Sequence, residues 1–161
     1  MQLFSLLVAT LGPTVIAFEF TNPDVDSKIN LSAPITISWE DFEGGNSSVF
    51  DLWWQGELAD GGATFGYSLK ENLTGASGEY SWDPTNVTEA LLGSKNRLST
   101  DDVFYFEALV HDKNDTATTE GMTGDSFAVE GYELMGSLGN LVRPATNILV
   151  AVAAVAGALL I

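Results

Sequence analysis

The stretch VFYFEALVH, residues 103–111, is the clearest structural signal in this chain. Apolar and polar side chains alternate along it, and the side chains of a β-strand point alternately to opposite faces of the sheet. The stretch therefore predicts a strand with one face in a core. The residues expected to face the core are Phe104, Phe106, Ala108 and Val110, and those expected on the opposite face are Tyr105, Glu107, Leu109 and His111.

The same alternation recurs nearer the N-terminus. In Ile35–Glu40 the three large apolar side chains fall on one face, which predicts a second strand packed on the core. Val49–Gly56 alternates too, but its adjacent tryptophans cannot both point inward. We expect Trp54 in the core and Trp53 on the wetter face, which Asp51 marks.

The predicted fold class is all-β. Short alternating segments are separated by turn residues, which is typical of an immunoglobulin-like β-sandwich of about seven strands, expected over residues 18–131. The expected strands are Phe18–Thr21, Ile35–Glu40, Val49–Gly56, Thr64–Leu69, Glu79–Trp82, Val103–His111 and Ser126–Glu130. One helical turn is expected at Asn86–Gly93, with Asn86 and Glu89 at capping-box spacing. The chain has no cysteine, so packing must replace a disulfide.

The two ends of the chain predict processing in the secretory pathway. Residues 1–17 have the apolar run and the small residue at the cleavage site of a signal peptide, with cleavage expected after Ala17. Residues 148–161 form an uncharged apolar tail, shorter than the roughly 20 residues of a spanning helix. With the short linker 132–147, they match a glycosylphosphatidylinositol (GPI) signal, expected to be removed on attachment at Ser137 or, alternatively, Gly136. A single transmembrane tail is the other interpretation.

The charge of the chain excludes one class of partner. It carries 22 acidic and six basic residues, for a formal net charge of −16. Such a field repels phosphate backbones, so nucleic acid is excluded as a partner.

Five N-x-Ser/Thr sequons lie between the two processing signals. A single sequon arises easily by chance, but five in one small domain predict a glycoprotein of the secretory pathway. The sequon asparagines are Asn30, Asn46, Asn72, Asn86 and Asn114.

The order of several short motifs resembles one known family. The motifs are Phe20-x-x-Pro23, Ile35-Thr36-Ile37-Ser38-Trp39, Gly78-Glu79-Tyr80-Ser81-Trp82 with Pro84, Phe104-Tyr105-Phe106, and Ser126-Phe127-Ala128-Val129. They resemble the fungal Ser-Thr-rich GPI-anchored membrane proteins, whose N-terminal immunoglobulin-like domain is shared with Kre/Knh-type cell-wall synthesis proteins. The resemblance implies a protein of the plasma membrane or cell wall, and it implies no catalytic residues. The Ser/Thr-rich stalk of the family is missing here.

Catalysis and metal binding find little support in the residues. His111 is the only histidine, no nucleophile-elbow motif is present, and we expect His111 to be a solvated residue at a strand end. Copper-dependent polysaccharide oxidation requires an N-terminal histidine, whereas the mature chain would begin at Phe18. The acidic groups near Glu40 and Asp101 are expected to be solvated loop charges rather than a glycosidase pair. Asp24–Asp26 and Asp112–Asp115 lack the layout of a calcium loop. We therefore expect no enzyme, no metal and no cofactor.

One binding hypothesis remains. If the Val49 and Val103 strands are neighbours, outward Trp53 and Tyr105 could form a stacking platform for a cell-wall polysaccharide such as β-glucan, with Asp51, Gln55 and Glu107 as a hydrogen-bonding rim. The alternative is that a loop or a glycan covers Trp53. The main prediction is thus a non-enzymatic, GPI-anchored cell-surface glycoprotein with a structural or wall-organising role. A glucan-binding module is the alternative, and the oligomeric state stays open.

Overall fold

The computed structural model describes residues 18–40, 42, 48–60, 62–136 and 150–151. These residues form mostly β-strands, and the predicted all-β class is confirmed. The signal peptide, Asn46, Ser137 and nearly all of the apolar tail lie outside the described residues.

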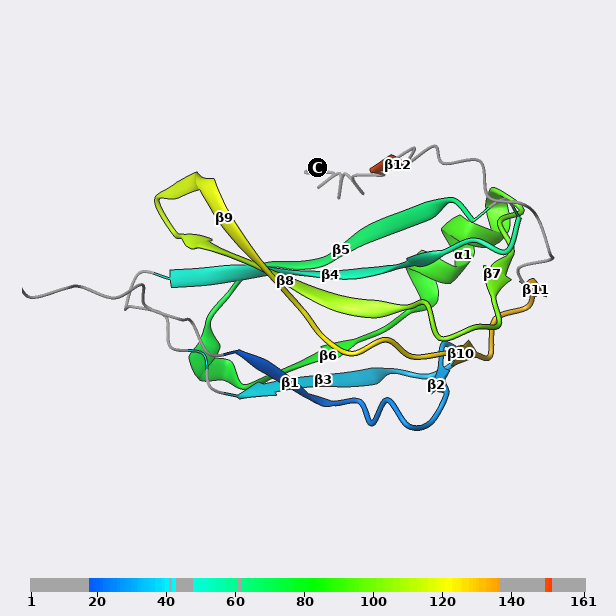
Figure 1. Cartoon of the computed structure of the whole chain (residues 1–161), viewed down its shortest axis with the longest axis horizontal. Helices are drawn as coiled ribbons and strands as arrows, with labels where there is room; N and C mark the ends of the chain where they lie inside the picture. Colours follow the sequence, from blue (N-terminus) through cyan, green and yellow to red (C-terminus); the bar gives the residue numbers. More distant parts are fainter. Residues whose placement is uncertain (1–17, 41, 43–47, 61, 137–149, 152–161) are drawn as a thin grey trace, which may run out of the picture.

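Two sheets lie face to face as layers (Figure 1). The smaller sheet has the order β1-β3-β6, with β1 Glu19–Asn22, β3 Ile35–Glu40 and β6 Glu79–Trp82. The larger sheet has the order β12-β5-β4-β8-β9, with β12 Val150–Ala151, β5 Thr64–Leu73, β4 Ser48–Glu57, β8 Tyr105–Asp112 and β9 Asp115–Thr123. Neighbouring strands are antiparallel, except that β12 runs parallel to β5.

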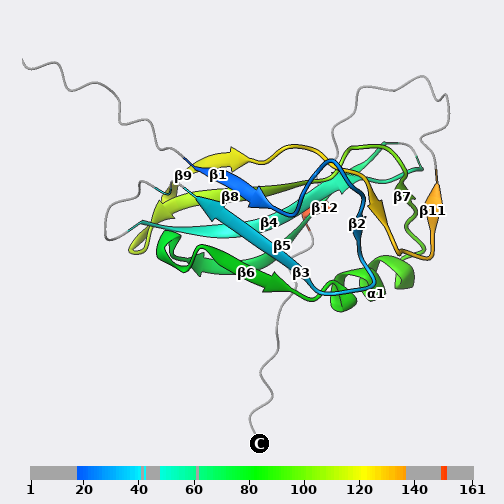
Figure 2. The same ribbon diagram turned by 90° about the horizontal axis from the view of Figure 1, so that it is seen from below.

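Shorter elements connect the layers. Two parallel pairs join β10 Val129–Glu130 to β2 Ile29–Asn30, and β11 Met135–Gly136 to β7 Leu98–Ser99. A 3₁₀ turn, η1 Gly75–Ser77, precedes β6, and the helix α1 Thr85–Gly93 follows it. Figure 2 shows α1 at one end of the layers, near β7 and β11.

Aromatic rings from both sheets fill the space between the layers. Trp54 of β4 is fully buried and contacts Trp82 of β6, with ring centroids 5.2 Å apart. Its ring stacks on Phe104 at 5.7 Å. Trp39 of β3 meets Phe50 of β4 edge to face at 5.0 Å. Each large aromatic side chain buries about 150–250 Å² of surface, so this cluster supplies the packing that a cysteine-free domain needs.

The predicted inward residues are confirmed on all three long alternating segments. The side chains at the predicted core positions of β3, β4 and the strand around β8 are at most 7% exposed. These residues are Ile35, Ile37, Trp39, Phe50, Leu52, Trp54, Phe104, Phe106, Ala108 and Val110.

The predicted cap of the helix is wrong. Asn86 is the second residue of α1, and the helix begins at Thr85 after Pro84, without a side-chain cap bond. Instead, Asp83 Oδ1 accepts the Thr85 backbone N–H at 3.0 Å and its hydroxyl at 2.6 Å. The side-chain bond from Thr85, followed by the backbone bond, lowers the pKa of Asp83. The helix therefore begins one residue before the predicted start, directly after a turn that the Asp83 carboxylate closes.

The packed unit continues past the predicted domain end at residue 131. Tyr132 is 6% exposed, and its hydroxyl donates to the Asn96 carbonyl at 2.7 Å. β11 then pairs with β7, and the Gly136 carbonyl accepts the Thr100 N–H at 3.1 Å. Residues 132–136 therefore belong to the domain rather than to a linker. No helix of the described part of the chain has the length and apolarity needed to cross a membrane.

Candidate functional site

The outer face is the side of the larger sheet that points away from the core. Its members on β4 and β8 occupy alternate positions and are Val49, Asp51, Trp53, Gln55, Tyr105, Glu107, Leu109 and His111. Pairing without interruption sets Trp53 opposite Glu107, and Gln55 opposite Tyr105. The five predicted ligand residues are thus brought together, and each is half-buried.

A hydrogen bond divides the predicted platform. Gln55 Nε2 donates to Glu107 Oε2, so these two side chains span one diagonal of the four-residue square. Trp53 and Tyr105 occupy the other diagonal, where long side chains on paired strands can still interact. The Gln55–Glu107 bond therefore crosses the diagonal that joins Trp53 and Tyr105.

Glycines on the flanking strands give the outer-face side chains room. A Cβ at Gly66 of β5 would lie 3.6 Å from Trp53 Cε3 and 3.5 Å from Gln55 Oε1. On β9, a Cβ at Gly121 would lie 3.1 Å from Glu107 Oε1. Trp53 therefore leans toward β5 and Glu107 toward β9. The buried Nε1 of Trp53 has no hydrogen-bond partner among the described residues.

Partial burial shapes the acid–base chemistry of this face. Burial raises the pKa of Glu107, and the bond from Gln55 opposes that rise. Burial raises the pKa of Tyr105 too, with smaller contributions from the charges of Glu107 and Glu57. Tyr105 is thus a neutral hydroxyl at physiological pH. Hydroxyl, amide and carboxyl groups beside an indole can hydrogen-bond and stack against a polyol.

The prediction of a solvated His111 is wrong. The residue is 5% exposed, and its cross-strand partner Val49 is 4% exposed, although both lie on the outer face. Pairing of β8 with β9 shifts register between Val110 and Asp112, which places His111 at a bulge. Sequence alternation carries no information about such a bulge.

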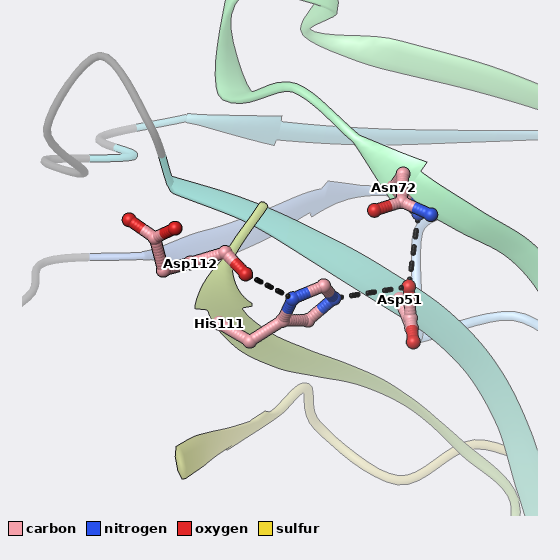
Figure 3. Close-up of polar contacts among 4 residues, drawn as sticks. All are labelled: Asp51, Asn72, His111 and Asp112. Atoms are coloured by element: carbon pink, nitrogen blue, oxygen red, sulfur yellow. Dashed lines mark hydrogen bonds and ion pairs between the residues drawn. The ribbon is translucent and has the colours of Figure 1, made fainter. Parts of the chain in front are cut away.

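Both ring nitrogens of His111 are engaged (Figure 3). Nδ1 lies 3.0 Å from the Asp112 carbonyl, and Nε2 lies 3.3 Å from Asp51 Oδ1. Two acceptors call for two N–H donors, which only the imidazolium provides. The Asp112 carbonyl raises the pKa of His111 most, burial lowers it, and Asp51 raises it further. The raised pKa therefore favours the imidazolium over the neutral ring, and both nitrogens are engaged within the domain.

Asp51 connects His111 to the end of β5. The same Oδ1 accepts the backbone N–H of Asn72 at 2.9 Å. The Asp51 side chain is 27% exposed, and that of His111 2% exposed. Asp51 on β4 therefore bonds to both neighbouring strands, β8 and β5, through Oδ1. A ligand could hydrogen-bond to its other carboxylate oxygen.

Four sequon asparagines lie on the surface. Asn30 in β2, Asn72 in β5, Asn86 in α1 and Asn114 after β8 are all exposed. Asn46 lies outside the described residues, as does Ser137, whereas the alternative attachment residue Gly136 is buried in β11.

The acidic turns are closed by local bonds. Asp24 Oδ1 accepts the Asp26 N–H at 3.1 Å, and Asp112 Oδ1 accepts the Asn114 N–H at 2.8 Å. Within the described ranges, no three His, Cys, Asp or Glu side chains converge as a metal site would require. Two cavities, of about 160 and 250 Å³, flank Asn22–Pro23 and include no residue of the outer face.

Comparisons with family models, with curated proteins and with solved structures found no match to this chain.

Proposed function

We propose that this chain is a non-enzymatic, GPI-anchored glycoprotein of a fungal cell surface, with a structural or wall-organising role. The observation that carries the proposal is the exposure of all four sequon asparagines in the described part of the chain, and β11 packs as far as Gly136, next to the proposed attachment site Ser137. Attachment there would replace the apolar tail, including the two residues of β12 that pair with β5, with lipid and hold the domain against the plasma membrane. The exposed sequon asparagines fit the same destination.

We assign the domain to the immunoglobulin-like class on its strand order. In that class, strands A, B and E share one sheet, and C, F and G share the other, which a C′ strand can join. The order β1-β3-β6 corresponds to A-B-E, and β5-β4-β8-β9 corresponds to C′-C-F-G. A strand D between β5 and β6 has no counterpart among the described residues, where η1 takes its place.

The resemblance to the Ser-Thr-rich GPI-anchored family supplies the cell-wall part of the proposal. Its motifs fall on core elements: Phe20 in β1, Ile35–Trp39 in β3 and Glu79–Trp82 in β6. The missing stalk favours a site at the plasma membrane over one across the wall. The doubly bonded His111 supports a non-enzymatic role, because the single histidine has no free nitrogen.

Phospholipase release tests this proposal. The full chain is expressed in a yeast that attaches GPI anchors, and its membranes are treated with phosphatidylinositol-specific phospholipase C. The proposal predicts that the protein moves to the soluble fraction. A chain that stops after Ser137 should be secreted without treatment. Full-length protein that stays in the membrane after treatment, and leaves it only in detergent, would show a transmembrane tail.

A second candidate function is the binding of wall β-glucan on the outer face. Half-buried Trp53, beside the bonded Gln55–Glu107 pair, favours it, with Tyr105 as a second contact. Soluble β-glucan should change the tryptophan emission of the folded domain. A Trp53→Ala variant should lose the change and Tyr105→Phe should weaken binding, whereas Tyr67→Phe on the core side should bind normally. An equal response in Trp53→Ala would exclude the outer face.

A further inference from the structure

Asn72 lies at the border of the outer face. It is exposed, it belongs to the last part of β5, and its N–H donates to Asp51 Oδ1 at 2.9 Å. Asp51 and Trp53 are two residues apart on β4 and share a face, so their Cα atoms are about 6.6 Å apart. A sugar on Asn72 therefore starts beside Asp51, one outward-facing position from Trp53 along β4.

The backbone at Asn72 is held in one conformation. Its φ is +55°, in the left-handed region that asparagine tolerates better than most residues. Asp51 accepts its N–H, and His111 in turn lies 3.3 Å from the same Oδ1. A buried cation thus fixes the carboxylate that fixes Asn72. The root of a glycan here would be oriented by the fold rather than free to swing.

Trp53 offers the matching surface. It points away from the core and is half-buried, while the other three tryptophans, Trp39, Trp54 and Trp82, are at most 4% exposed. The Cε3 edge of its ring lies beside Gly66, which has no side chain of its own, and the Gln55 amide lies next to it. The pyranose ring of N-acetylglucosamine has an apolar C–H face, and covering a half-exposed indole with it removes apolar surface from water.

We infer that the N-linked glycan of Asn72 folds back across the outer face and stacks its first N-acetylglucosamine units on Trp53. This inference rests on the proposed glycoprotein. Asn30 and Asn86 are less suited, since β2 and α1 are not strands of the larger sheet. Asn114 is less suited because it lies beyond Asp112, which pairs with Ser48, five residues from Trp53 along β4. In this arrangement the His111–Asp51 pair positions the asparagine that carries the glycan. Trp53 is accessible to an external glucan only where the Asn72 glycan is absent.

The test removes the glycan without changing Asn72. Thr74→Ala destroys the sequon Asn72-Leu73-Thr74, and the Thr74 side chain caps nothing in η1. Thr88→Ala destroys the sequon of Asn86 and is the matched control. All chains are full length and secreted from a eukaryotic host. Intact mass reports glycan occupancy, and acrylamide quenching of tryptophan fluorescence reports the exposure of Trp53.

The expected result is a loss of one glycan mass in each variant, with stronger quenching and a red-shifted emission in Thr74→Ala alone. Adding Trp53→Phe should abolish this difference, which assigns the signal to Trp53. Unchanged mass in Thr74→Ala would overturn the inference by showing that Asn72 is unmodified. Loss of mass with unchanged quenching would overturn the stacking and leave the glycoprotein intact. Absence of glycan from every sequon would contradict the proposed function itself.

Discussion

The Nε2 atom of His111 lies 3.3 Å from Asp51 Oδ1, on the side of the larger sheet that faces away from the core. This pair joins β8 to β4, and the Asn72 N–H on the same oxygen adds β5. One charge pair therefore organises three strands at the border of the candidate site.

The first prediction is a pH dependence of stability. The folded state raises the pKa of His111 above its ordinary value of 6.5. Its contribution is therefore complete below the unfolded pKa, and it is lost as the pH rises through the folded pKa. Urea unfolding between pH 6 and 9 should show stability falling with pH. His111→Gln should flatten this slope, and an unchanged slope in the variant would assign it to other groups.

Glu107 must be separated from His111 in that experiment. Its pKa is raised as well, so its contribution is also lost as the pH rises, starting from its ordinary value of 4.5. Comparison of wild type with His111→Gln at each pH cancels the Glu107 contribution.

The second prediction concerns the two ion pairs that involve aspartate. Asp51→Asn leaves a buried imidazolium without its counter-charge and should cost about 1–3 kcal/mol in the free energy of unfolding. Asp60→Asn removes the partner of Arg97, at 3.4 Å, where the side chains are 65% and 49% exposed. That exposed pair is worth about 0–1 kcal/mol. Equal losses measured by denaturant unfolding would contradict the structural role of Asp51.

The third prediction distinguishes the adjacent tryptophans. Trp54→Ala opens a cavity beside Phe104 and Trp82 and should cost about 3–5 kcal/mol. Trp53→Ala removes a half-buried side chain outside the core and should cost about 1–2 kcal/mol. Thermal unfolding of both variants measures the difference. A larger loss in Trp53→Ala would reverse the assigned faces of β4.

Such face assignments are what the sequence predicts well. Strict alternation in β3, β4 and β8 places each side chain because a period of two leaves no choice once one face is apolar. The meeting of Trp53, Gln55 and Glu107 on one face follows from the same rule and from the pairing of β4 with β8.

The sequence could not reveal β9, nor the burial of His111. The nine residues Asp115–Thr123 form an edge strand of mostly polar side chains, and Met122 packs against the core. Without apolar alternation, such a strand resembles a loop. The register shift at His111 lies in the pairing of β8 with this unpredicted strand.

The fourth prediction tests the packing at the end of β4. A Cβ at Gly56 would lie 2.2 Å from Phe104 Cδ1, so Gly56→Ala must displace a buried ring and should cost about 1–3 kcal/mol. Gly93→Ala at the end of α1 is the control, because a Cβ there meets nothing within 4 Å. It should gain up to about 1 kcal/mol from helix propensity. Equal stability of both variants would exclude this packing.

Mass spectrometry of the mature C-terminus tests the central proposal most directly. Trypsin cleaves after Lys113 but not at the Arg143–Pro144 bond, so an unprocessed chain yields a peptide that starts at Asn114 and includes the apolar tail 148–161 after enzymatic deglycosylation. The GPI proposal predicts that this peptide is missing from the membrane-bound protein, and that a peptide ending at Ser137, or at Gly136, with an ethanolamine-linked anchor remnant replaces it. Recovery from the mature membrane-bound protein of the peptide that runs from Asn114 through the apolar tail 148–161 would contradict the anchor.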